Sequence, residues 1–129
     1  MNPRKIFTPL LLASMLIPGI STSAVTTEDF KVKTTKNLIN LCTVSTEDPH
    51  YKEAIHFCHG YLVGAYYFYA AQYKNDSANQ LVCFPEPNPT TNAVIEKIVS
   101  WAQKHPEFMN ELPVETEFRA LTNLWPCKK

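Results

Sequence analysis

The most regular stretch of the chain is 51–73, where apolar residues recur at the three- and four-residue spacing of a buried helix face. The positions on this face are Tyr51, Ala54, Ile55, Cys58, Tyr61, Leu62, Ala65, Tyr69 and Tyr73. A second apolar line runs beside it, through Phe57, Gly60, Gly64, Phe68 and Ala71. A helix that is apolar over most of its circumference is usually surrounded by other helices. We therefore expect a long central helix packed on several sides.

Three shorter segments, 34–42, 91–104 and 113–125, have the pattern of helices with one buried face. Their expected inward positions are Leu38, Ile39, Leu41 and Cys42 in the first, Val94, Ile95, Ile98, Trp101 and Ala102 in the second, and Val114, Phe118, Leu121 and Leu124 or Trp125 in the third. We expect Asp48 to cap the central helix, with Pro49 at its first position, and 25–33 to form an extended arm. The pattern predicts an all-α fold, a compact bundle of four to five helices around the long central one.

Gly60 and Gly64 stand four residues apart inside the predicted central helix. A glycine in a helix interior costs about 1 kcal/mol relative to alanine, so two on one face need a compensating reason. The reason we expect is a structural groove, in which the missing side chains let a neighbouring helix approach closely. A Gly60→Leu substitution should then damage folding.

The first 24 residues resemble a secretory signal peptide. Arg4 and Lys5 provide a positive start, 10–20 is a short apolar run, and Thr22-Ser23-Ala24 offers small residues for cleavage. The prediction is a signal peptide at 1–24, export, and one helical domain at 25–129. The apolar run 54–71 is long enough to span a membrane, but its histidines, cysteine and tyrosines favour a buried helix of a bundle.

Charge gives no support for a nucleic acid or an anionic membrane as the partner. Without the leader the chain has ten Lys and Arg against twelve Asp and Glu, spread along its length without a basic stripe. A protein is the partner that this balance favours.

Four cysteines follow the leader: Cys42, Cys58, Cys83 and Cys127. An even number at wide spacings in a small exported domain indicates two disulfides. The sequence leaves three connectivities open. Because short connections favour antiparallel neighbours, we prefer 42–58 with 83–127.

Candidate catalytic and metal-binding groups are present, but each has a simpler interpretation. Cys58 beside His59 suggests a thiolate and a base, yet neighbours on a helix point about 100° apart and Cys58 is expected to be oxidised. His56 and His59 share a helix face without a third metal ligand nearby in sequence. The acids Glu107, Glu111, Glu115 and Glu117 are expected to favour a helix N-terminus or to solvate a loop. We predict no catalytic residue, no metal and no cofactor.

The end of the central helix is richer in aromatic residues than its own core requires, and such residues are enriched at protein interfaces. The candidate partner contacts are Tyr66, Tyr67 and Tyr73, together with Asp48 and His50 in the loop 45–50; the loop 74–80 is a further candidate. The alternative, that the tyrosines only fill the core, stays open.

Five short motifs occur in an order and spacing that resemble the Rap/Tai-type immunity proteins. They are Leu41-Cys42, Cys58-x-Gly60-Tyr61-x-x-Gly64, Cys83-Phe84-Pro85-Glu86, His105-Pro106-Glu107 and Trp125-Pro126-Cys127. The resemblance covers 35–127. It implies a small periplasmic helical protein, not an enzyme, that protects a bacterium by binding and occluding a peptidoglycan amidase effector of a type VI secretion system. Members are often dimers, so a homodimer is also expected.

Two other functions stay open from the sequence. One is a general periplasmic protein-binding or chaperone-like module that uses the aromatic surface without a dedicated toxin partner. The other is an enzyme or metal protein that uses His56 and His59.

Overall fold

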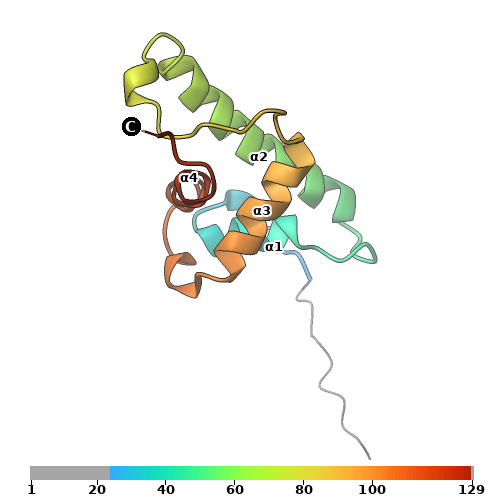
Figure 1. Cartoon of the computed structure of the whole chain (residues 1–129). Helices are drawn as coiled ribbons and strands as arrows, with labels where there is room; N and C mark the ends of the chain where they lie inside the picture. Colours follow the sequence, from blue (N-terminus) through green and yellow to red (C-terminus); the bar gives the residue numbers. More distant parts are fainter. Residues whose placement is uncertain (1–23, 129) are drawn as a thin grey trace, which may run out of the picture.

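A computed structural model describes residues 24–128 of the chain. The predicted signal peptide at 1–24 lies outside the described residues, apart from Ala24. The described part contains four α-helices: α1 (Thr35–Cys42), α2 (Tyr51–Gln72), α3 (Thr91–Gln103) and α4 (Pro113–Leu124). It also has three single 3₁₀ turns, η1 (Asp29–Lys31), η2 (Ser77–Asn79) and η3 (Pro106–Phe108), and no β-strand (Figure 1). The prediction of an all-α fold around a long helix is confirmed.

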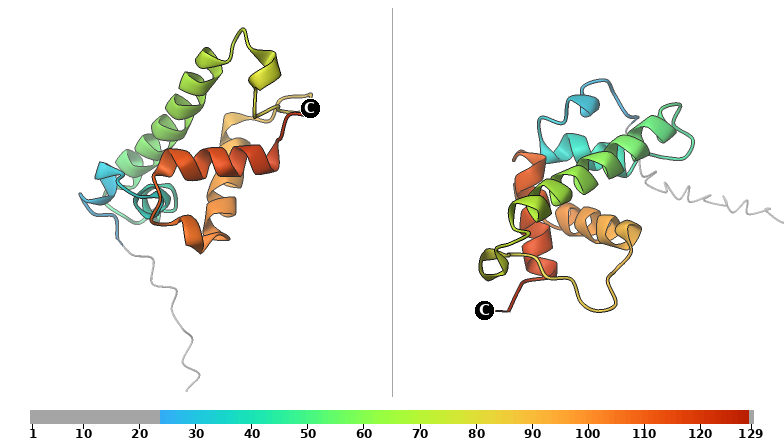
Figure 2. Two further views of the ribbon diagram at one scale, coloured as in Figure 1. Left: turned by 90° about the vertical axis from the view of Figure 1, so that its left-hand side faces the viewer. Right: turned by 90° about the horizontal axis from the view of Figure 1, so that it is seen from above.

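Helix α2 is less enclosed than its sequence suggests. Its buried residues are Ala54, Cys58, Leu62 and Tyr69, which form one narrow line along the helix. Helices α1, α3 and α4 pack against that line, and the C-terminal half of α2 extends past α1 and α3 (Figures 1 and 2). The packing of other helices against the first apolar line is confirmed, whereas the expected packing along the second line, through Phe57, Gly60, Gly64 and Phe68, is wrong, because these residues face solvent.

The core lies where α1, α3 and α4 meet the buried line of α2. Its members outside α2 include Leu38, Leu41, Val82, Ile95, Ile98, Ala120 and Leu121. In helix α4 the buried residues are Pro113, Thr116, Glu117, Ala120 and Leu121. Val114, which was expected to point inward, is 38% exposed. The buried face of α4 is thus rotated from the predicted one, and it carries an acid.

The N-terminal segment is folded against α1, so the prediction of an extended arm is wrong. Val25 is buried, and the carboxylate of Asp29 accepts hydrogen bonds from the side-chain amides of Asn37 and Asn40 at 3.2 and 2.9 Å. These hydrogen bonds, together with those from Thr26, hold the pKa of Asp29 below its ordinary value even though burial acts to raise it. The segment therefore belongs to the folded domain.

Helix ends follow local chemistry in most cases. Thr34 and Asn37 form a reciprocal capping box at the start of α1, and Thr90 caps α3 by accepting from the amide of Ala93 at 3.3 Å. Helix α2 begins at Tyr51, two residues later than predicted, with His50 as its N-cap. The carboxylate of Asp48 instead accepts from the backbone amides of His50 and Val25, at 2.8 and 3.0 Å.

Both disulfides join the pairs that we preferred. Cys42 is bonded to Cys58, with Cα atoms 5.2 Å apart, and Cys83 to Cys127, with Cα atoms 4.8 Å apart. The second bond lies in a short antiparallel contact, where the amide of Cys83 donates to the carbonyl of Trp125 at 2.9 Å. The chain entering α3 is thereby fixed to the end of α4. No helix within residues 24–128 is both long and apolar enough to cross a bilayer.

Candidate functional site

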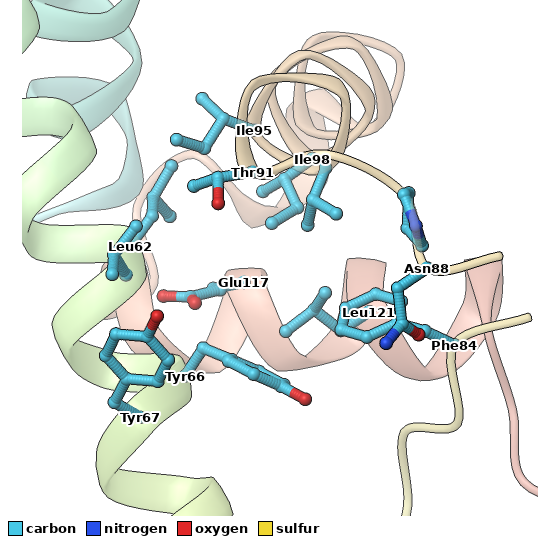
Figure 3. Close-up of a pocket in the computed structure, with 13 residues that line it drawn as sticks. Leu62, Tyr66, Tyr67, Phe84, Asn88, Thr91, Ile95, Ile98, Glu117 and Leu121 are labelled. Carbon is cyan, nitrogen blue, oxygen red and sulfur yellow. The ribbon is translucent and has the colours of Figure 1, made fainter. Parts of the chain in front are cut away.

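A cavity of about 280 Å³ lies between α2, α3, α4 and the proline-rich loop before α3 (Figure 3). Its lining residues are Leu62, Val63, Tyr66 and Tyr67 from α2, Thr91, Val94, Ile95 and Ile98 from α3, Glu117 and Leu121 from α4, and Phe84, Asn88 and Pro89 from the loop. We call it the Glu117 cavity. Most of its wall is aliphatic or aromatic, and its polar side chains are few, which is the usual character of a small-ligand site.

The Glu117 side chain is the one carboxyl group on this wall. The residue is 1% exposed, and Figure 3 shows its carboxyl group directed into the cavity. Neither carboxyl oxygen has a hydrogen-bond partner among the described residues. Burial raises the pKa of Glu117 to about 8, because the charged form is poorly solvated there. At neutral pH the carboxyl group is therefore mostly protonated.

The sequence interpretation of Glu117 as a solvated acid at a helix N-terminus is wrong. Glu115, in the first turn of α4, is exposed as expected, whereas Glu117 lies on the buried face. The available signal was spacing, since Glu117 is four residues after Pro113 and four before Leu121, and both of those are buried. A charged residue on an apolar helix line is easily assigned to the solvent side, because acids are rarely fully buried.

Two of the five predicted partner contacts meet at the rim of this cavity. Tyr66 is half-buried, with its ring centroid 5.4 Å from that of Phe84 and 6.2 Å from that of Tyr67. Burial raises the pKa of Tyr66 above its ordinary value. Tyr67 is 65% exposed. This end of α2 therefore presents one half-buried tyrosine, packed at a tilted angle against Phe84, and one tyrosine open to solvent.

The other three predicted contacts lie elsewhere. Tyr73 follows the C-terminal end of α2 and is half-buried, with its ring centroid 4.9 Å from that of Tyr69. Asp48 and His50 precede the N-terminal end of the same helix, which is 22 residues long. A helix of that length spans about 33 Å, so these residues do not share one site. The Asp48 carboxylate is engaged with backbone amides, which keep the pKa of Asp48 below its ordinary value.

A second hollow lies on the other side of the C-terminal half of α2. It is lined by Ala65, Phe68, Tyr69, Gln72, Tyr73, Leu81, Val114 and Phe118. Phe68 is 68% exposed and Leu81 is 47% exposed. We call the aromatic face the three exposed residues of this wall, Phe68, Leu81 and Val114, together with Tyr67, which precedes Phe68 in the chain and lines the Glu117 cavity. The sequence identified Tyr67 of this face but not Phe68 and Val114, because periodicity placed those two on sides of helices that were expected to be buried or close-packed.

The groove predicted at Gly60 and Gly64 is absent from the folded chain. Both glycines are exposed, and a Cβ atom added at either would meet nothing within 4 Å. No helix of the described chain approaches them, so the expected reason for two glycines is wrong. The expectation that Gly60→Leu damages folding falls with it.

Alanine at Gly60 or Gly64 should stabilise the isolated protein. Each substitution restores helix propensity in open space and is expected to raise the free energy of unfolding by about 0.5–1 kcal/mol. Urea denaturation of the two single variants measures this directly. A loss of stability in either variant would contradict the open environment and would show that a copy of the chain or another molecule packs there.

The other residues considered as catalytic or metal-binding groups are either bonded to another residue or too few in one place to form a site. Cys58 is in a disulfide, so it supplies no thiolate to His59. Glu111 accepts from the guanidinium of Arg119 at 3.0 Å, near the surface. Within residues 24–128 no group of three or more His, Cys, Asp or Glu side chains is placed to hold a metal ion.

The fold defines a class of protein: a small helical bundle, closed by two disulfides, with exposed aromatic residues beside an apolar cavity. A family model described as Rap1a immunity proteins matches residues 34–127. The chain therefore belongs to the Rap1a immunity protein family. Neither the comparison with curated proteins nor that with solved structures gave a match.

Proposed function

We propose that this protein is a periplasmic immunity protein that binds a secreted peptidoglycan amidase and blocks its substrate cleft. Membership of the Rap1a family supports an immunity role. The five motifs from Leu41 to Cys127 support the Rap/Tai type, whose partners are amidase effectors of type VI secretion systems. Two disulfides suit an exported protein, as does the predicted signal peptide at 1–24. In this proposal the protein acts by binding alone and is not an enzyme.

The observation that carries the proposal is the aromatic face. A large exposed apolar surface on a small protein indicates an interaction site, and aromatic residues are enriched among those that contribute most to binding. Phe68 and Tyr67 are neighbours in the chain and are each about two-thirds exposed. They lie on the half of α2 that extends past α1 and α3 (Figure 2). The exposed side of this half of the helix can lie in an enzyme cleft while its other side packs on α4, so occlusion is the mechanism that we propose.

Co-expression of this protein with an amidase directed to the periplasm tests the proposed function. Cells that express the amidase in the periplasm should lyse, and co-expression of this protein should restore growth. The proposal predicts that a small exported hydrolase is encoded beside this protein, and that hydrolase is the amidase to use. Full lysis despite stable periplasmic expression, together with no complex in gel filtration, would reject the proposal.

The double substitution Tyr67→Ala/Phe68→Ala should weaken binding of the amidase at least a hundredfold. Each truncation removes a ring that becomes buried in the complex, and such residues can cost 2 kcal/mol or more apiece. Isothermal titration calorimetry measures the affinity. The matched control is His56→Ala, an exposed change on the same helix at its other half. Unchanged affinity in the double variant would place the interface elsewhere, and a changed mass of the free protein would assign the face to a homodimer.

A chaperone-like role is the second candidate, because the same exposed rings could hold unfolded clients. It predicts that the protein suppresses aggregation of several unrelated denatured proteins at similar concentrations. Selective binding of one hydrolase without such suppression would exclude it.

A further inference from the structure

The Glu117 cavity holds an acid that nothing in the folded domain explains. The groups facing it can be named element by element: α2 presents the phenols of Tyr66 and Tyr67, α3 presents the hydroxyl of Thr91, and the loop presents the amide of Asn88. Burial raises the pKa of the Tyr61 phenol of α2, and the nearby charge of ionised Glu117 raises this pKa further. Helix α1 carries the ionisable Lys36, which is exposed. No cation faces Glu117 within residues 24–128.

A buried carboxyl group without a partner lowers stability, so its presence points to a role outside folding. Both oxygens are free, which leaves a two-pronged acceptor of the kind that binds ammonium and guanidinium groups through charge-assisted hydrogen bonds. The wall around the carboxyl group of Glu117 is mostly apolar. Leu62, Ile95, Ile98 and Leu121 offer contacts for methylene groups and none for charges (Figure 3).

The volume of the Glu117 cavity limits the size of the ligand that it can hold. The volume of about 280 Å³ lies just below the range of about 300–1,000 Å³ that is usual for drug-sized ligands. The cavity therefore suits a small molecule or a single long side chain. An anion would meet the carboxyl group unfavourably, and a purely apolar ligand would leave both oxygens without a partner.

We propose that the Glu117 cavity is a binding site for an organic cation, an alkylammonium or alkylguanidinium group on an aliphatic stem. The charged head pairs with Glu117, and the stem contacts the leucine and isoleucine side chains of the wall. The cation can belong to a free amine or to a lysine or arginine side chain of another protein. The site does not depend on the proposed immunity function, because its test needs no effector.

Binding should be coupled to release of a proton. Glu117 is mostly protonated at neutral pH, and pairing with a cation requires the ionised form. The affinity for a permanently charged ligand should therefore rise about tenfold per pH unit up to about pH 8 and then level off. An apolar ligand would show no such dependence.

The test is a titration of the chain 25–129, with its disulfides intact, followed by nuclear magnetic resonance. The probes are n-pentylamine and n-butylguanidine, with 1-pentanol as the uncharged match, each up to about 20 mM because ligands of this size bind weakly. We expect saturable shifts at α3 and α4 with both cations and weaker binding of the alcohol. Glu117→Gln should weaken cation binding at least tenfold and abolish its pH dependence. Glu115→Gln, an exposed change on the same helix, should alter neither.

Two further arms complete the design. Nα-acetyl-lysine methylamide and Nα-acetyl-arginine methylamide carry the same cations on a peptide unit; binding at least as tight as that of the free probes identifies a protein side chain as the source, and weaker binding identifies a free amine. Ile98→Phe should block the cavity and abolish binding while leaving Glu117 in place. The proposal is overturned if neither cation binds, if pentanol binds as tightly, or if Glu117→Gln binds with wild-type affinity.

Discussion

Replacing Cys83 and Cys127 together by alanine is expected to lower the free energy of unfolding by about 4 kcal/mol. The bond joins residues 44 apart, and closing a loop of that length restricts the unfolded chain strongly. The Cys42–Cys58 bond joins residues 16 apart, so the same reasoning gives about 3 kcal/mol for its removal. Either loss is large for a small domain, whose total stability is commonly about 5–15 kcal/mol.

Denaturation in urea, with the remaining disulfide kept oxidised, measures both effects. The two double alanine variants serve as controls for each other, because each retains one bond. The entropic explanation fails if the Cys42→Ala/Cys58→Ala variant is the less stable of the two, or if either loss is below about 1 kcal/mol.

Glu117→Leu is expected to make the protein more stable, and the gain should grow as the pH rises. The pKa of Glu117 is about 8 in the folded protein and near 4.5 when unfolded. Between these values the unfolded chain binds fewer protons, so the stability of the wild type falls with rising pH. The fall can reach about 5 kcal/mol above pH 8, at about 1.4 kcal/mol per pKa unit. Leucine removes this penalty.

Urea denaturation at pH 5 and at pH 8.5 measures the free energy of unfolding of the wild type and of Glu117→Leu. The stability difference between Glu117→Leu and wild type should be several-fold larger at pH 8.5. Glu115→Leu, at an exposed site of the same helix, should show no such increase. Equal pH dependence in wild type and Glu117→Leu would show that the carboxyl group is solvated.

The lowered pKa values of Asp29 and Asp48 affect stability in a separate pH range. Their contribution to the free energy of unfolding is lost only as the pH falls below about 4.

The elements and the disulfides could be predicted because both depend on local or countable features. Thr34 and Thr90 cap helices through contacts within three residues, and Pro113 starts a helix through its fixed backbone angle. The disulfide pairing followed from short connections between neighbouring helices. Such features do not require knowledge of which faces finally meet.

Of the candidate sites only Tyr66 and Tyr67 were named from the sequence, because the other members depend on how much of each helix the others cover. The sequence of α2 is apolar on most sides, but three short helices bury only one line of it, which leaves Gly60, Gly64 and Phe68 exposed. The rotation of α4 then brings Glu117 inward and turns Val114 outward. Periodicity shows that a helix has an apolar side, but a neighbouring face can be the one that packs.

The Cys83–Cys127 bond has a consequence for where in a cell the Glu117 cavity can exist. Phe84, Asn88 and Pro89 form the loop wall of the cavity, and this bond fixes the start of that loop to the end of α4. Thiols are kept reduced in the cytosol and oxidised in exported proteins. If the protein is exported as proposed, the loop wall would become tethered to α4 only when Cys83 and Cys127 are oxidised outside the cytosol.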